Sequence, residues 1–287
     1  MENTYKKRSQ LADVWSRFKR NHMALAGLIV LLIMILIALF ADFIADFETE
    51  VIRQDIPNRL RPPCLEHWFG TDEFGRDIFA RIAHGTRVSL QVGVISVGIA
   101  LVIGGFLGAI AGFYGGIIDN IIMRVMDVFL AVPGMLLAIA IVAALGSSMT
   151  NLMIAVGISS MPAYARILRA SVLSVKDMEF VEAARAIGAK NMTIIMSHII
   201  PNSLAPVIVQ STLGVAGAIL ATAALSFIGL GIQPPNPEWG AMLSSGRAFM
   251  RDYPHVVLFP GLSIMITILV LNMIGDGLRD ALDPRLK

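Results

Sequence analysis

The stretch Ser174–Asn202, SVKDMEFVEAARAIGAKNMTIIMSHIIPN, carries charges of both signs between two long runs that have none. The flanking runs, 128–165 and 203–231, are apolar enough to cross a lipid bilayer. Charged side chains cost free energy in the hydrocarbon core, so we expect the stretch to lie in water between two membrane spans. Its position therefore sets the topology of the second half of the chain.

Local signals in this stretch predict a short helix. Ser174-x-x-Asp177 resembles a capping box, which marks the start of a helix. Glu179 and Glu182 would follow early in the helix, where acidic side chains complement the positive end of the helix dipole. The apolar residues at helical spacing are expected to share one face: Phe180, Ala183, Ala184 and Ile187.

A turn and a second helix are predicted next. Gly188 is expected to end the first helix, because the residue after a helix often takes a left-handed conformation that glycine adopts freely. Asn191 is expected to cap a second helix, and Pro201 is expected to end it. The stretch is thus predicted to be two short helices joined by a sharp turn at the membrane surface.

Glu182-Ala183-Ala184, with Gly188 and then Ile199-Ile200-Pro201 at longer spacing, resembles the cytoplasmic coupling loop of permease subunits in ATP-binding cassette importers. His198, which precedes Ile199, is similar to the residue found in the di- and oligopeptide branch. The resemblance implies that an ATPase subunit contacts this loop. The residues to which it assigns the contact are Glu182, Ala183, Ala184, Gly188 and Pro201.

Composition supports a protein that crosses the membrane several times. The chain has 287 residues, of which 56% are hydrophobic and 15% charged, and its mean hydropathy is +0.72. A single cysteine, Cys64, excludes a disulfide framework within the chain and any cysteine-based zinc or iron–sulfur site. We expect the lipid bilayer as a partner, and nothing in the formal net charge of +2 indicates nucleic acid.

The first transmembrane helix is predicted at 23–45. Residues 1–22 form a basic N-terminal segment, and the positive-inside rule places it in the cytoplasm. A signal peptide is the alternative. The uncharged run is longer than the roughly 7 to 15 residues of a signal h-region, and no small-residue cleavage site follows it.

An extracytoplasmic loop is predicted at 46–87. Its motif Gly70-Thr71-Asp72-x-x-Gly75-Arg76-Asp77 resembles the lead-in segment of peptide-type permeases. The nearby acidic and histidine residues match neither an EF-hand loop nor a two-histidine zinc helix, so no metal site is expected. The following residues predict an amphipathic interfacial helix, with Ile78, Phe79 and Ile82 on one side and Asp77, Arg81 and His84 on the other.

The second span is predicted at 88–114 and carries small residues at steps of four, which allow another helix to approach closely. These residues are Ser96, Ala100, Gly104, Gly108, Gly112 and Gly116. Packing within the chain and an interface with another subunit both explain the pattern.

The third and fourth spans are predicted within 128–165, separated by an external turn at 146–151. Pro133 and Pro162 are each expected near a cytoplasmic end. Three charged residues at the start of the third span are expected to lie at a solvated or interfacial helix end: Asp119, Arg124 and Asp127.

The fifth span is predicted from Ser203 to about Gly231, and the sixth from His255 to Gly275. Between them an external interfacial helix is expected, with Asn236 as its cap and Pro237 at its first position. A stripe of large apolar residues supports that helix: Trp239, Met242, Leu243, Phe249 and Met250. The last segment, 276–287, is predicted to be a cytoplasmic tail, and it also resembles the peptide-permease branch.

These expectations combine into an all-α membrane protein with six transmembrane helices. One N-terminal helix precedes a five-helix permease core at 88–275, which includes the coupling loop at 170–202. Most of the 23 Lys and Arg residues fall on the predicted cytoplasmic side, so both termini are expected there.

The predicted function is that of a permease subunit in an ATP-driven importer of di- or oligopeptides. The sequence has no G-x-x-x-x-G-K-[ST] motif, so the chain is not expected to be an enzyme or to need a cofactor. The resemblance implies a second, related permease subunit, two ATP-binding subunits and an extracytoplasmic substrate-binding protein. It also implies the cytoplasmic (inner) membrane of a bacterium or archaeon.

Three alternatives remain. The same architecture can import a nickel chelate, an opine or a glutathione-like solute. A secondary transporter or channel would carry ionisable residues at mid-membrane or interrupted helices in repeated halves, and neither is evident in the sequence. A membrane-embedded enzyme would need a catalytic constellation, but H-E-x-x-H is absent and no serine in a span pairs clearly with a histidine or aspartate.

Overall fold

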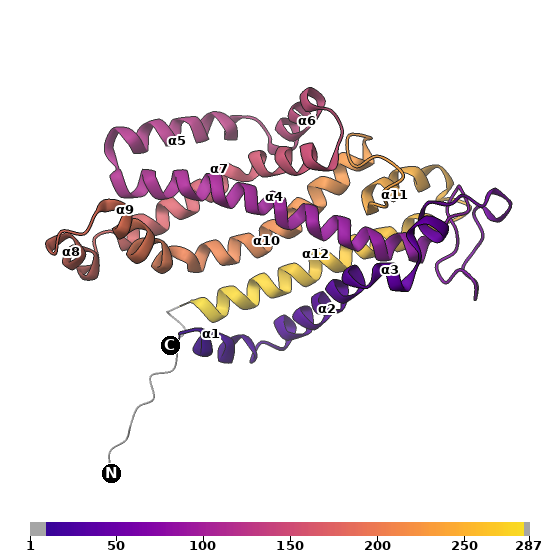
Figure 1. Ribbon diagram of the computed structural model, residues 1–287, viewed down its shortest axis with the longest axis horizontal. Helices are drawn as coiled ribbons and strands as arrows, with labels where there is room; N and C mark the ends of the chain where they lie inside the picture. The colour runs from indigo at the N-terminus through magenta and orange to yellow at the C-terminus, as the bar shows by residue number, and fades with distance from the viewer. Residues whose placement is uncertain (1–9, 284–287) are drawn as a thin grey trace, which may run out of the picture.

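The computed structural model describes residues 10–283, and nearly all regular structure in that part of the chain is helical (Figure 1). The α-helices are α1 (Gln10–Phe18), α2 (His22–Leu39), α3 (Ala41–Ile44), α4 (Ile78–Tyr114), α5 (Gly116–Ala131), α6 (Gly134–Leu145), α7 (Met149–Val175), α8 (Glu179–Ala186), α9 (Asn191–Ile194), α10 (Ile200–Phe227), α11 (Trp239–Gly246) and α12 (His255–Leu282). Phe47–Ile52 and Ile195–Ile199 are π-helical, and Ile56–Asn58 and Arg247–Phe249 form 3-10 turns. The basic residues expected at 6–8, 285 and 287 lie outside the described residues.

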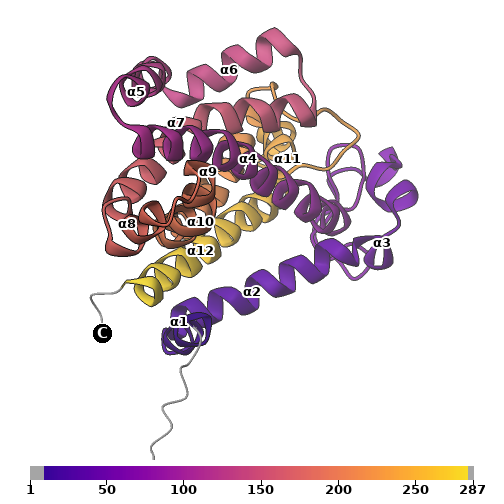
Figure 2. The ribbon, with the colours of Figure 1, turned by 60° about the vertical axis from the view of Figure 1, so that its left-hand side comes forward.

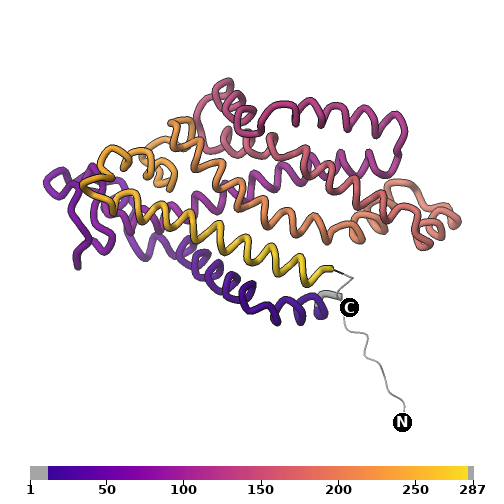
Figure 3. The backbone as a smooth tube through the Cα atoms, turned by 180° about the vertical axis from the view of Figure 1, so that it is seen from behind, coloured from indigo at the N-terminus to yellow at the C-terminus, as the bar shows by residue number. Residues whose placement is uncertain are grey.

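The long helices form a bundle whose two ends differ (Figure 1). The α8 end holds α8, α9 and the start of α1, and the α11 end holds α3, α11 and the loop that joins α3 to α4. Figure 3 shows α2 running beside α12 along one side of the bundle. Each long helix passes between these two ends, as membrane-crossing helices must.

Six membrane-crossing segments agree with the sequence prediction, with one difference in shape. Five are long apolar helices: α2, α4, α7, the continuous helical run from Asn191 to Phe227, and α12. The sixth is the pair α5 and α6, which are bent by 87° at a short break (Figure 2). Pro133 lies at this break, as the N-cap residue of α6, whereas Pro162 lies well inside α7, so the prediction that Pro162 lies near a helix end was wrong.

Several helices extend past their predicted boundaries through charged residues that find partners. α7 ends at Val175 rather than near residue 165, because Arg169 Nε and Nη2 donate to Asp119 of α5 at 2.5 and 2.6 Å, and Arg166 donates to Asp127 at 2.7 Å. These ion pairs join α7 to α5 along one side. α12 likewise continues to Leu282, so the described part of the predicted tail at 276–287 is mostly helix.

α4 begins at Ile78, ten residues before the predicted start of the second span. The Asp77 carboxylate caps it by accepting a hydrogen bond from the Ala80 N–H at 2.8 Å. Arg81 and His84 were expected on the side of an interfacial helix opposite its apolar residues, and the structure shows that their side chains are buried. Arg81 donates to the Val51 carbonyl at 3.0 Å, and His84 Nε2 lies 2.9 Å from the Ala45 carbonyl. The polar face of this helix therefore binds the α3–α4 loop.

Small residues let α4 pack closely on α7, which confirms packing within the chain as the role of most of the stripe. A β-carbon at Gly104 or Gly108 would run into the backbone of Met161 or Ala165, and one at Gly112 would lie 2.9 Å from the Arg169 carbonyl oxygen. The two backbones are close enough that only glycine fits between them. Gly116 is different, because it lies in α5 with open space around its Cα.

α11 is a short helix anchored between the ends of α4 and α10. Glu238 caps it, because its two carboxylate oxygens accept hydrogen bonds from the Gly240 and Ala241 N–H groups at 2.9 and 2.8 Å. The expected cap at Asn236, with Pro237 at the first helical position, was therefore wrong. Burial raises the pKa of Glu238. Trp239 is also buried, and its indole N–H donates to the Ile82 carbonyl of α4 at 3.3 Å.

Candidate functional site

The segment predicted to couple the permease to an ATPase projects from the α8 end of the bundle (Figure 1). Its first helix, α8, starts at Glu179 with Met178 as the N-cap residue and no side-chain cap. The capping box predicted at Ser174 and Asp177 was wrong, because Ser174 lies in the last turn of α7 and its hydroxyl donates to the Ser171 carbonyl at 2.7 Å. The segment between the two spans is therefore shorter than predicted.

Gly188 ends α8 as the sequence predicts, with φ at +80°. The Gly188 N–H donates to the Arg185 carbonyl at 3.0 Å, and the Ala189 N–H donates to the Ala184 carbonyl at 3.1 Å. This pair of bonds defines a Schellman motif, which satisfies two carbonyls at the end of the helix. No atom lies within 4 Å of the position that a β-carbon at Gly188 would take. The glycine is therefore required by backbone conformation and not by lack of space.

The face of α8 that packs on the bundle differs from the face predicted from the apolar pattern. Val181 and Ala184 are fully or nearly buried, and they belong to a cluster formed by the ends of α4, α7 and α10. Of the predicted face, Phe180 is 39% exposed and Ile187 is 85% exposed. An apolar side chain that faces water is unfavourable unless a partner covers it. The outer face of α8 is thus a candidate contact surface.

Exposed methionines extend this surface along the chain. Met178, Met192 and Met196 lie before and after α8, and each is about half exposed. Methionine side chains are flexible and polarisable, which suits them to protein interfaces. Sequence reasoning missed these residues, although three large apolar side chains in a charged stretch are a visible signal. We call Met178, Phe180, Ile187, Met192 and Met196 the apolar coupling surface.

Contacts with the bundle fix the position of α8. The Arg185 guanidinium lies over the Phe113 ring of α4, with 5.6 Å between the guanidinium carbon and the ring centroid. Together with the buried Val181, this contact ties the short helix to the end of α4. A force on α8 therefore acts on a membrane-crossing helix.

The second half of the segment is continuous with α10. α9 begins at Asn191 with Lys190 as the N-cap residue, so Asn191 does not cap it. A π-helical turn, Ile195–Ile199, follows directly and runs into α10. Pro201 lies in the first turn of α10 and does not end the helix as predicted. Because proline has no N–H to donate, the regular helical hydrogen-bond pattern is interrupted at Pro201. The π-helical turn ends two residues before this interruption.

Four of the five predicted contact residues lie in α8 or in the turn that follows it, but only three of them are exposed. Glu182 and Ala183 are exposed on α8, and Gly188 is exposed in the turn that follows. Ala184 lies on the opposite, buried face, where its size allows close packing on the bundle. Pro201 is exposed but lies one segment further along, at the start of α10.

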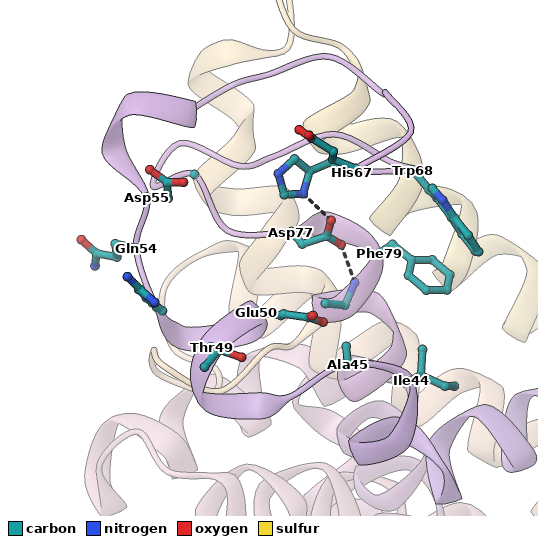
Figure 4. A pocket seen from close by; sticks show the side chains of 14 residues that line it. Ile44, Ala45, Thr49, Glu50, Gln54, Asp55, His67, Trp68, Asp77 and Phe79 are labelled. Atoms are coloured by element: carbon teal, nitrogen blue, oxygen red, sulfur yellow. Dashed lines mark hydrogen bonds and ion pairs between the residues drawn. The ribbon is translucent and has the colours of Figure 1, made fainter.

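A second candidate site is a pocket at the α11 end of the bundle, in the α3–α4 loop (Figure 4). Its volume is about 790 Å³. Figure 4 shows His67 turned toward Asp77, and Trp68 beside Phe79. The π-helical turn Phe47–Ile52 forms one wall and is capped by Asp46, whose pKa is lowered by hydrogen bonds from the Thr49 side chain and backbone N–H.

Metal ligands do not gather at either site. No group of three or more His, Cys, Asp or Glu side chains that could hold a metal ion occurs between residues 10 and 283.

Comparison with solved structures identifies the fold. The chain is similar to the inward-facing MetNI methionine ABC transporter, with a TM-score of 0.58 and 17% identity over 71% of this chain and 96% of that chain. An amino acid ABC transporter is similar with a TM-score of 0.54 and 16% identity over 70% of this chain and 94% of that chain. The matched part of this chain, about seven tenths of its length, thus shares its fold with chains of ABC transporters.

Sequence comparison gives the family. The chain belongs to the binding-protein-dependent transport system inner membrane components, whose family model matches residues 104–287. Residues 9–63 match the N-terminal transmembrane domain of oligopeptide transport permease C. The protein is therefore a multi-pass membrane permease component and not an enzyme.

Two curated relatives cover almost the whole chain. A dipeptide transport system permease protein of Alkalihalophilus pseudofirmus is 52% identical over 286 residues, which are 100% of this chain and 93% of the relative. A glutathione transport system permease protein of Escherichia coli is 48% identical over 275 residues, which are 96% of this chain and 90% of the relative.

Proposed function

We propose that the protein is one permease subunit of an ATP-driven importer of di- or oligopeptides in a bacterial or archaeal cytoplasmic membrane. It pairs with a second, related permease subunit, and the two form the translocation pathway. Two ATP-binding subunits supply the energy, and an extracytoplasmic substrate-binding protein delivers the solute. The observation that carries this proposal is the apolar coupling surface around α8, which is exposed although Val181 and Ala184 of that helix are buried against the bundle.

The α8 end receives the motion of the ATPase. Exposed Glu182, Ala183 and Gly188 lie beside the apolar coupling surface, so a partner that covers the apolar side chains also contacts these residues. The anchoring of α8 to α4 and the continuity of α9 with α10 then transmit the movement to two membrane-crossing helices. Pro201 lies at the point where the second path enters the membrane span.

The substrate is proposed to be a short peptide because of the two relatives, which are named for dipeptide and glutathione transport. Both solutes carry amide bonds and charged ends. The test is uptake into proteoliposomes that contain the complete importer and its binding protein. A labelled dipeptide should accumulate only with ATP inside, and unlabelled dipeptides should compete better than glutathione, an opine or a nickel chelate. Uptake that prefers one of the last three solutes would change the substrate class, and uptake without the ATPase subunits would contradict the importer itself.

Topology provides a separate test, since the proposal places the α8 end in the cytoplasm and the α11 end outside. When the permease is present without its ATPase subunits, Ile187→Cys in a Cys64→Ser background should react with a membrane-impermeant maleimide only from the cytoplasmic side, because residue 187 is 85% exposed at the α8 end. Native Cys64, in the α3–α4 loop, should react only from outside. Reaction of both cysteines from the same side would overturn the proposed orientation.

A further inference from the structure

The pocket in the α3–α4 loop carries an excess of acidic side chains. Four carboxylates line it, from Glu50, Asp55, Glu66 and Asp77, whereas Arg53 supplies the only lysine or arginine charge among its described lining residues. Its volume of about 790 Å³ is large enough for a long side chain and its neighbours. The charge of the lining favours a cationic occupant.

Three of these carboxylates already have partners, but Glu50 does not. His67 Nδ1 lies 2.7 Å from Asp77 Oδ2, and Arg61 Nη1 donates to Glu66 at 2.8 Å. Asp55 accepts a hydrogen bond from the Asn58 side chain at 2.8 Å. The Glu50 carboxylate forms no hydrogen bond or ion pair with any of residues 10–283. It is therefore the group that remains available to bind a cation.

Trp68 and Phe79 form an aromatic part of the pocket lining (Figure 4). The Trp68 and Phe79 ring centroids are 5.1 Å apart, and Trp68 is 65% exposed. The face of a tryptophan ring attracts an ammonium or guanidinium group, and the ring edge packs against the methylene groups that carry it. Carboxylate and aromatic ring together fit the side chain of arginine or lysine.

The rim of the pocket indicates that the cation belongs to a protein. Leu65, three residues before Trp68 in the chain, is 96% exposed on a loop that lies outside the membrane-crossing helices. A second hollow of about 460 Å³ borders the first and shares Glu66 with it. A protein partner could fill both hollows and cover the exposed apolar side chains near them. A small solute bound in the first hollow would leave Leu65 exposed to water.

We propose that this pocket is a docking site for an extracytoplasmic protein partner, which inserts an arginine or lysine side chain between Glu50 and Trp68. The partner's apolar surface covers Leu65. This inference rests on the proposed function, which places the α11 end outside the cell and supplies a soluble substrate-binding protein there.

Docking should therefore depend on Glu50. The complete importer is placed in lipid nanodiscs, and binding of the peptide-loaded substrate-binding protein is measured by biolayer interferometry. Glu50→Lys is expected to raise the dissociation constant roughly three- to tenfold, because it replaces an attraction with a repulsion at a partly exposed site. Trp68→Ala should weaken docking by a similar factor. Added salt should weaken docking of the wild type and reduce the difference caused by Glu50→Lys.

Glu48→Lys is the matched control. Glu48 is exposed in the same π-helical turn and carries the same charge, but it does not line the pocket. Equal dissociation constants for the Glu48 and Glu50 variants would overturn the docking site. Absence of any docking by the wild-type importer would instead overturn the proposed function. The two failures are thus distinguishable.

A free cation is the competing occupant. Arginine methyl ester is titrated into the importer without binding protein, and tryptophan fluorescence is recorded. No saturable change at micromolar concentrations is expected, since most of the proposed interface is then missing. A saturable change that Trp68→Phe removes would show a solute site and overturn the docking proposal.

Discussion

Gly108→Leu is expected to prevent stable packing of the permease. A β-carbon at residue 108 would collide with the carbonyl oxygen of Ala165 and lie 2.8 and 2.9 Å from its carbonyl carbon and Cα. These are backbone atoms of α7, which cannot turn aside as a flexible side chain would. Separating α4 from α7 should cost about 3 kcal/mol or more, toward the upper part of the range for overpacked cores. The isolated chain in detergent should show a clearly lower melting temperature and poor recovery as a single species.

Gly98→Leu is the control on the same helix. No atom lies within 4 Å of the position that a β-carbon at Gly98 would take, so the same side chain should be accommodated there. Both variants add the same apolar surface and remove one glycine from α4. A melting temperature for Gly108→Leu equal to that of Gly98→Leu would contradict the close approach of α4 and α7.

The number of membrane-crossing segments could be predicted from the sequence, whereas several of their ends could not. Uncharged runs of sufficient length mark the spans directly. Helix ends were predicted where charges begin, and this rule failed at Arg169, which is paired with Asp119 of α5, and at Arg81, which is buried under the α3–α4 loop. Whether a charge ends a helix depends on partners that lie far away in the sequence.

The bend between α5 and α6 also depends on contacts that the local sequence does not reveal. The charge-free run contains Pro133, which marks a possible break, but proline alone gives neither the size nor the direction of a bend. The 87° angle depends on how the neighbouring helices pack. A regular third span was therefore the natural expectation from sequence.

At the coupling segment, backbone requirements were easier to predict than faces. Gly188 was identified correctly because a Schellman turn needs a left-handed residue at that place. The predicted apolar face placed Ala184 together with Phe180 and Ile187, because apolar residues are normally assigned to the core, but Phe180 and Ile187 are exposed. On α8 the smaller pair, Val181 and Ala184, packs inward instead. A helix that binds both its own bundle and a partner has two apolar faces, and periodicity does not tell them apart.

Gly188→Val is expected to uncouple ATP hydrolysis from uptake while leaving the permease folded. With φ at +80°, a β-carbon costs roughly 1 to 2 kcal/mol, and a β-branched side chain costs more. The open space around Gly188 excludes a steric clash, so the strain acts only on the turn that fixes the direction of α8. Coupling between sites is typically worth about 1 to 3 kcal/mol, so a strain of this size is enough to disrupt it. Uptake per ATP hydrolysed should fall severalfold, at normal levels of assembled permease pair.

Two further variants distinguish the effect of strain in the turn after α8 from the effect of backbone strain elsewhere in the chain. Gly146→Val introduces the same side chain at φ +89°, also with open space around it, but at the other end of the bundle between α6 and α7. It should cost at least as much stability, because its ψ of 157° places it in a backbone region that is essentially restricted to glycine, and it should leave uptake per ATP unchanged. Gly188→Asn should retain most coupling, because asparagine tolerates the left-handed region better than valine does. If Gly146→Val uncouples as strongly as Gly188→Val, backbone strain anywhere in the chain is sufficient, and α8 loses its special role. If Gly188→Val leaves uptake per ATP unchanged, as Gly146→Val should, the turn at Gly188 does not position the ATPase contact.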